Sequence, residues 1–163
     1  MSPHRTLTVT LCLLAATACT PSRQAPAVQV SAQDATLNSR WFANLASPGS
    51  LAGAVQMNGS ASMAPSPDGA STNVTLNLAN ASPGGVHPWA VHRGQCGAGM
   101  DNGVFGQDET YRALEVESDG HANGTATVPL PTPATGRYFV VVLASAANPE
   151  TIVACGNLAP PTQ

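Results

Sequence analysis

The side chains of this sequence best suited to metal binding are its histidines, cysteines and methionines, four of each. His87 and His92 fall within one short apolar segment, and imidazole nitrogen is a ligand that copper and zinc favour. A lone histidine at the end of a strand is more often a hydrogen-bonded structural residue, so we interpret both as structural. Met57, Met63 and Met100 show no ligand spacing, which favours core or surface positions over a soft copper site.

The acidic side chains offer two further combinations that could do chemistry. Glu115 and Glu117 would share one face of a strand, but nothing nearby supplies a site for them, so a solvated face is expected. His121 directly follows an Asp-Gly pair and is predicted to be an exposed turn residue. Three more acids follow Cys96 without the spacing of a calcium-binding loop; they are Asp101, Asp108 and Glu109.

The composition restricts the classes of fold and partner. Charged residues make up 9% of the chain, lysine is absent, and the formal net charge is −3. Without a basic cluster to neutralise phosphates, nucleic-acid binding is not expected. A length of 163 residues with 43% hydrophobic residues suits one folded domain with appendages. The abundant small and turn-forming residues favour an all-β domain.

The N-terminal segment has the features of an export signal. Residues 6–17 are apolar but too few to span a bilayer, and we interpret residues 1–18 as a signal peptide. Ala16-Thr17-Ala18 before Cys19 resembles a bacterial lipobox, in which Cys19 becomes the lipidated first residue. A lipobox more typically has Leu at the position of Ala16, and the same residues fit an ordinary A-x-A cleavage site. Residues 19–38 are rich in Pro, Ala, Gln and Ser and predict a flexible tether.

Export also determines the expected state of the cysteines. If Cys12 is removed and Cys19 is lipidated, Cys96 and Cys155 remain as an isolated pair. In an oxidising compartment such a pair predicts a disulfide. Closing so long a loop would stabilise the domain by roughly 4–5 kcal/mol in the chain-entropy model. The alternative is that Cys12 and Cys19 are merely small apolar residues of the signal.

From residue 39 onward the sequence predicts short strands separated by turns. Asn73–Asn80 alternates apolar and polar residues, which is typical of a half-buried antiparallel strand. Arg137–Leu143 is the most hydrophobic run and the candidate central strand. Pro65–Gly69 has strong turn chemistry. A first strand is expected to begin near Arg40. The other expected strands are Leu51–Met57, Val86–His92, Leu114–Glu117, Thr125–Leu130 and Ile152–Cys155. Seven or eight strands without a helical period predict a β-sandwich or β-barrel over residues 39–160.

Gly85–His92 resembles the Gly-x-His-x-φ-His-x-His signature of the Cu/Zn superoxide dismutase family. Other segments are similar in the same order, and the resemblance covers about residues 40–159. It implies a dismutase-like Greek-key barrel of antiparallel strands. The further matching segments are Leu51–Val55, Val74–Leu78, Gly136–Leu143, and Cys96 with Ala154–Gly156 at the positions of the family's disulfide.

The departures from the family concern its copper ligands. Two of them come from alternating positions of the signature strand, which face the same way. Here the first is Ala90 and only His92 remains, while Leu143 occupies the position of a later copper-binding His. His87 matches a family His that is not a ligand and braces the barrel by local hydrogen bonds.

The zinc and substrate positions depart as well. Gly97–Tyr111, where the family's zinc loop should lie, contains no His. Ile152 stands at the position of the substrate-guiding Arg, and the electrostatic loop has shrunk to Ala144–Thr151. A redox copper site needs about three or four placed ligands, so the resemblance implies the fold without dismutase activity.

The sequence therefore predicts an exported domain of a bacterial cell envelope, lipid-anchored to a membrane and facing the periplasm or the exterior. No cofactor is expected, with copper or zinc at His92 and His87 as the alternative. Two other functions stay open. One is a divergent periplasmic copper-binding protein or dismutase with a reduced ligand set, and the other is a structural envelope module that binds through an exposed barrel face.

Overall fold

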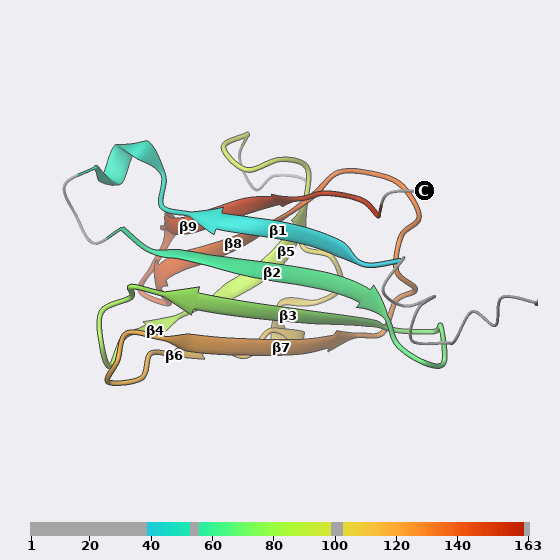
Figure 1. The fold of residues 1–163 in the computed structure, drawn as a ribbon, viewed down its shortest axis with the longest axis horizontal. Coiled ribbons are helices and arrows are strands. Elements are labelled where there is room, and N and C mark those ends of the chain that lie inside the picture. The colour runs from blue at the N-terminus through green and yellow to red at the C-terminus, as the bar shows by residue number, and fades with distance from the viewer. Residues whose placement is uncertain (1–38, 53–55, 99–102, 162–163) are drawn as a thin grey trace, which may run out of the picture.

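The computed structural model describes residues 39–52, 56–98 and 103–161, and these form an all-β fold (Figure 1). Their only helical segments are two single 3-10 turns, η1 (Gly49–Leu51) and η2 (Asp108–Thr110). Within the described ranges, no helix is long and apolar enough to cross a membrane. The all-β prediction is confirmed.

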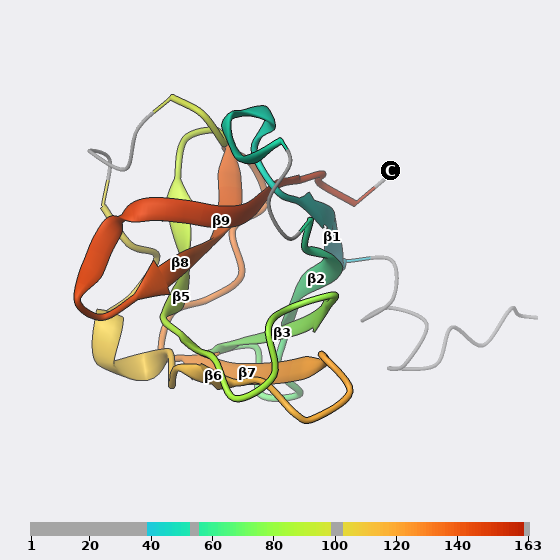
Figure 2. The ribbon, with the colours of Figure 1, turned by 90° about the vertical axis from the view of Figure 1, so that its left-hand side faces the viewer.

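Nine strands occur in the described residues, and seven of them form one antiparallel sheet. Their order in the sheet is β5-β8-β9-β1-β2-β3-β7, while β4 and β6 form a separate pair. The seven-stranded sheet curls into a half-barrel, and Figure 2 shows this curl from one end of the strands. The strands are β1 (Trp41–Ala46), β2 (Asn58–Pro65), β3 (Thr72–Ala79), β4 (Val86–His87), β5 (Trp89–Arg93), β6 (Leu114–Glu115), β7 (Ala122–Val128), β8 (Tyr138–Ser145) and β9 (Asn148–Leu158).

Three connections cross between the two ends of the curled sheet. The strands β3 and β7 lie at one end of the strand order, and β5 and β8 lie at the other. The chain nevertheless passes from β3 to β5, from β5 to β7, and from β7 to β8. Such crossings characterise Greek-key barrels. The second crossing contains residues 103–113, which lie beside the candidate site.

The core lies inside the curl and on both sides of β8. In β3, Val74, Leu76 and Leu78 face inward and are at most 2% exposed, as the alternation predicts. In β8, Val140 and Val142 join the main core, whereas Phe139 and Val141 pack with Cys155 on the opposite face. This strand is therefore buried on both faces, which confirms the prediction of a central strand.

The prediction of a strand over Leu51–Met57 is wrong for its described residues. Leu51 ends η1, and Met57 precedes β2, while residues 53–55 lie outside the described residues. The chain leaves the sheet after Ser47 and returns at Met57, where the two residues exchange hydrogen bonds of 2.9 and 3.0 Å. The strand that pairs with β3 is instead Asn58–Pro65.

Two further predictions are wrong, the single strand over Val86–His92 and the loop over Ala144–Thr151. Val86–His92 is not one strand, because Pro88 has no N–H and divides it into β4 and β5, which belong to different sheets. Ala144–Thr151 is not a loop: Ser145 pairs with Asn148 in a tight hairpin, so β9 begins four residues before the predicted Ile152.

The remaining predicted boundaries differ by a few residues, and the predicted turn is confirmed. The predicted strands Leu114–Glu117 and Thr125–Leu130 correspond to β6 and β7, which cover Leu114–Glu115 and Ala122–Val128. In the β2–β3 turn, Gly69 N donates to Ser66 O over 2.9 Å at a φ of 68°, a conformation that favours glycine. Hydrogen bonds from Ser66 and from the Ala70 N–H lower the pKa of the Asp68 carboxyl in this turn.

Candidate functional site

The candidate site is a hollow of about 290 Å³ between β5, the end of β8, the start of β9 and the η2 segment. Ala90, His92 and Leu143 all line this hollow. These are the three positions to which the resemblance assigns copper ligands in the family. The strand pairing brings them together, because β5 lies directly beside β8. We call this depression the His92 hollow.

His92 contributes the hollow's one imidazole among its lining residues. The side chain is 8% exposed, and its ring lies 5.6 Å from that of Phe139, the residue opposite it on β8. The backbone of His92 also forms a bridge with Val104. The imidazole is thus packed into the barrel wall at the border of the hollow.

The remaining wall of the hollow is mainly apolar. Ala90 presents a methyl group and Leu143 an isobutyl group at the positions of the other expected imidazoles. Asp108 and Glu150 supply the acidic side chains of the lining. Among the described residues, no group of three or more His, Cys, Asp or Glu side chains could hold a metal ion together. The donors present therefore do not fit the copper site of the dismutase family.

Aromatic side chains attach the segment 103–113 to the barrel. Trp89 Nε1 donates to Arg112 O over 2.7 Å, and the indole packs edge-on against Tyr111 at 5.1 Å. Tyr111 Oη donates to Phe105 O over 2.7 Å, and Phe105 N donates to Val91 O over 2.7 Å. Burial raises the pKa of the Tyr111 phenol. At the place where the resemblance would put a zinc loop, this chain has hydrogen-bonded rings.

The importance of these rings could not be derived from motif spacing. Phe105 and Tyr111 match no ligand or catalytic motif, so spacing alone does not distinguish them. One signal was available, since two of the few aromatic residues stand in an otherwise polar segment. In the structure, Gly106 lets this segment pack closely on β7, because a Cβ at this residue would lie 2.6 Å from Val128 Cγ1.

His87 lies outside the hollow and connects two strands. It is 7% exposed, and its Nδ1 is 3.0 Å from Leu143 O. A carbonyl oxygen can only accept, so Nδ1 donates this hydrogen bond. His87 Nε2 has no hydrogen-bond partner among the described residues and faces Gly85, where a Cβ would approach it to 2.9 Å. These contacts give His87 a structural role, as its sequence position indicates.

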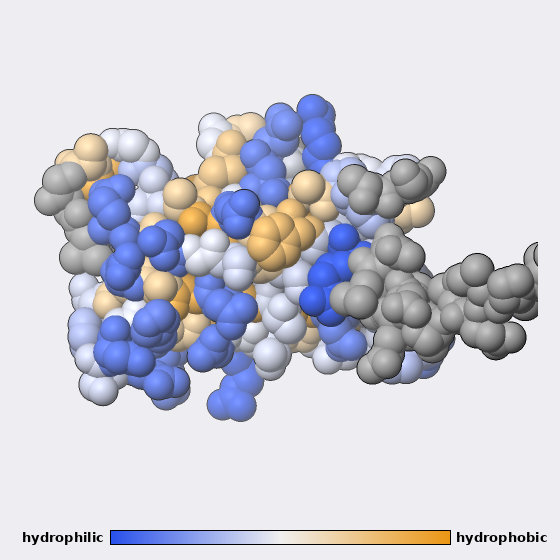
Figure 3. All heavy atoms as spheres, in the orientation of Figure 1, coloured by the Kyte–Doolittle hydropathy of each residue, from blue (hydrophilic) through white to orange (hydrophobic). Residues whose placement is uncertain are grey.

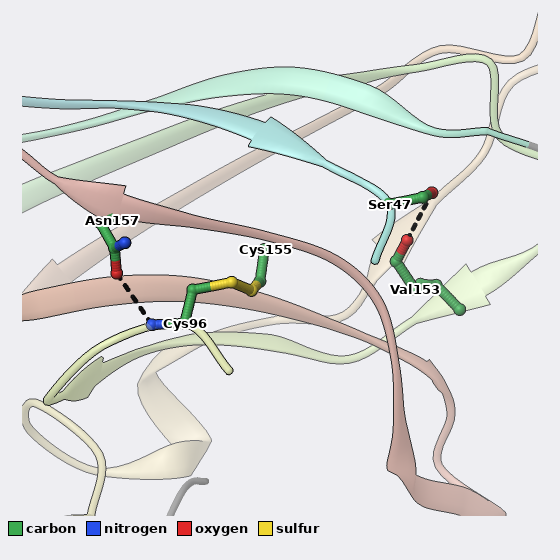
Figure 4. Close-up of a disulfide and its surroundings, with 5 residues drawn as sticks. All are labelled: Ser47, Cys96, Val153, Cys155 and Asn157. Carbon is green, nitrogen blue, oxygen red and sulfur yellow. Dashed lines mark hydrogen bonds between the residues drawn. A yellow bond between two sulfur atoms is a disulfide. The ribbon is translucent and has the colours of Figure 1, made fainter. Parts of the chain in front are cut away.

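The predicted disulfide between Cys96 and Cys155 is confirmed (Figure 4). The two Cα atoms are 6.0 Å apart, and the bridge ties the segment after β5 to β9. Asn157 reinforces this attachment, because its Oδ1 accepts from Cys96 N over 2.8 Å. A second hollow of about 580 Å³ borders the bridge, and Ile152 forms part of its wall.

The other candidates lie apart from the His92 hollow. Met57 and Met63 are buried in the core, at 7% and 0% exposure. Glu115 and Glu117 are exposed, and so is His121, whose N–H donates to Asp119 Oδ1 over 3.0 Å in the β6–β7 turn. Cys12, Cys19, Met100 and Asp101 lie outside the described residues.

Comparison with known proteins gives no further assignment of this site. No protein-family model matches the chain, and no curated protein matches it in sequence.

Proposed function

We propose that this chain is an exported, lipid-anchored domain of the Cu/Zn superoxide dismutase-like kind that does not dismutate superoxide. The observation that carries the proposal is the make-up of the His92 hollow. Three positions that would hold copper in the family meet there, and one of them has an imidazole. The crossing strands and the Cys96–Cys155 bridge support the family resemblance.

The count of donors explains why dismutation is not expected. The side chains of Ala90 and Leu143 have no atom that could bind copper, and that of Ile152 has no charge that could attract a superoxide anion. A metal held by His92 with solvent would bind weakly, because the coordinating side chains supply the binding free energy.

Metal content and superoxide dismutation together test this proposal. The purified full chain should retain no stoichiometric copper or zinc after dialysis against a chelator, and its rate should equal the free-metal background. The His92→Ala variant should give the same result. Activity that survives dialysis and disappears in His92→Ala would refute the proposal and favour the divergent copper protein. In that case Asp108 and Glu150, which line the hollow with His92, would have to supply the other copper ligands.

A gain-of-function variant tests the resemblance itself. Ala90→His with Leu143→His would place two more imidazoles around the His92 hollow. If the hollow has the family's geometry, this variant should bind Cu(II) more tightly than the wild type. Its affinity for Cu(II) should also exceed that of a control variant with histidines at the exposed residues Val86 and Gln107. Equal affinity of the two variants would count against a dismutase-like site.

The lipid anchor is tested separately. Replacing Cys19 with Ser should release the protein from the membrane fraction or block its maturation. Unchanged membrane partitioning and unchanged apparent mass would contradict the anchor and leave the proposed barrel unaffected.

A further inference from the structure

The outer face of the sheet formed by β1, β2, β3 and β7 contains no charged residue. None of these four strands has an Asp, Glu, Arg or Lys at any position. Figure 3 shows this side of the molecule, where blue and pale side chains alternate with small orange areas. The outward side chains are mainly amides and hydroxyls, with one aromatic ring and two small alanines: Phe42, Asn44, Ala46, Asn58, Ser60, Ser62, Asn73, Thr75, Asn77, Ala79, Asn123, Thr125 and Thr127. We call this set the neutral face.

Strand pairing arranges the neutral face into rows. Asn44 lies opposite Ser60, Ser60 opposite Asn77, and Asn77 opposite Asn123. Three interstrand spacings of about 4.8 Å make this row about 14 Å long. The next row runs in the same way from Phe42 to Thr125. Ser62 and Thr75 within it share a hydrogen bond of 2.9 Å, which holds their side chains in place.

The chemistry of the neutral face matches that of a sugar. Side-chain amides and hydroxyls both donate and accept hydrogen bonds. The hydroxyl groups of a sugar do the same. Phe42 is 47% exposed and offers an apolar ring against which the C–H side of a sugar ring can pack. A shallow hollow of about 530 Å³, bordered by Asn44, Ser60 and Asn77, gives the ligand a place to lie.

Other classes of partner fit this face less well. Nucleic acids and acidic polymers need cations, and basic partners need carboxylates, and the four strands have neither. Protein interfaces are depleted in Ser and depend on buried aromatic or Arg anchors, whereas Phe42 stands alone among hydroxyls and amides.

We propose that the neutral face binds a neutral polysaccharide, with Phe42 packing on a sugar ring and the Asn44–Ser60–Asn77 row bonding its hydroxyl groups. The site lies on the outside of the barrel, apart from the His92 hollow. The inference depends neither on the lipid anchor nor on the resemblance to dismutases.

Calorimetric titration of the full chain tests this proposal with three neutral probes and one acidic one. The neutral probes are cellohexaose, maltohexaose and N-acetylchitohexaose, and the acidic control is a heparin hexasaccharide. At least one neutral probe should bind, and heparin should not. Phe42→Ala should weaken binding about fivefold, because the aromatic contact is lost. Asn77→Asp should weaken it about tenfold, because a donor is replaced by a charge.

Matched controls separate the neutral face from the rest of the surface. Val86→Ala also truncates an exposed hydrophobic side chain, and Gln107→Glu also changes an amide to a carboxylate, both outside the four strands. Both controls should bind as the wild type does. Failure of all three neutral probes to bind, or equal losses in face and control variants, would overturn the proposal. So would dimerisation in solution that Phe42→Ala abolishes, since a second copy would then occupy the face.

Discussion

The strands β1, β2, β3 and β7 pair without any shift of register, whereas β8 and β9 shift at Val142/Leu143 and again at Leu143/Ser145. The first group, which we call the regular half, alternates buried and exposed residues along most of its length. The irregular half comprises β4, β5, β8 and β9 with the segment 103–113. It contains the disulfide, the hydrogen bond of His87 and the His92 hollow.

The two halves are stabilised in different ways. The regular half distributes its stability over many similar inward side chains, so that no single outward residue is essential. The irregular half depends on particular contacts, such as the bridge between Cys96 and Cys155 and the bond from His87 to Leu143 O. We therefore expect substitutions of polar side chains to be costly in the irregular half and mild in the regular half.

The largest effect is expected from the disulfide. Replacing Cys96 and Cys155 with Ser should lower the free energy of unfolding by about 2–5 kcal/mol, because the unfolded chain regains the freedom of a long loop. Urea unfolding followed by circular dichroism measures this change. Ser62→Ala with Thr75→Ala breaks an exposed hydrogen bond of the regular half and should cost less than about 1 kcal/mol. Equal losses in both variants would contradict the comparison.

The junction of the two halves should be the next most sensitive place. Gly156 of β9 lies against β1, where a Cβ would be 2.1 Å from Asn44 O. Gly156→Ala should therefore force the two backbones apart and cost about 2–3 kcal/mol. Gly49→Ala is the matched control, since a Cβ at Gly49 would meet nothing within 4 Å. A melting temperature for Gly156→Ala equal to that of the control would show that the junction can yield.

A smaller effect is expected at His87. His87→Leu removes the donor to Leu143 O and should destabilise the fold by about 1–2 kcal/mol. His87→Asn keeps a donor near the position of Nδ1 and should restore part of this loss. Chemical denaturation of both variants distinguishes a hydrogen-bond role from simple packing, for which Leu would be the better tolerated residue.

Tyr111 should give the smallest effect, and that effect should depend on pH. Burial raises the pKa of Tyr111, so its phenol stays protonated in the folded chain after it ionises in the unfolded chain near pH 10. The stabilisation is complete below pH 10 and is lost as the pH rises above it. Tyr111→Phe loses the bond to Phe105 O and should be about 1 kcal/mol less stable at pH 8. The deficit should shrink by pH 11 in thermal melts; a constant deficit would contradict this account.

The sequence allowed some elements to be predicted because their local pattern agreed with their final environment. Asn73–Asn80 has an unbroken period of two, and Arg137–Leu143 has the β-branched residues of a strand buried on both faces. The strand Asn58–Pro65 is not predictable from its own sequence, because its small residues have little β-propensity and pairing with β1 and β3 decides its conformation.

The candidate site was predictable in its residues but less so in its arrangement. The pairing of Cys96 with Cys155 followed from the expected export and from the resemblance, and the structure contains it. The His92 hollow depends on the register between β5 and β8 and on the tight β8–β9 turn that brings Glu150 near. The neutral face was not recognised, because its outward residues adjoin only after four strands are aligned.

The pairing of β1 with β9 has a consequence for the order of folding. Ala46 pairs with Cys155, which is far from it in the sequence, whereas the two strands of the β8–β9 hairpin are joined by a very short turn. Contacts between distant residues pay more loop-closure entropy and form later than local ones. During synthesis, β1 is made before β9, and the edge of β1 that pairs with β9 stays unpaired until β9 is complete. The curled sheet can therefore be completed only after β9 has been made.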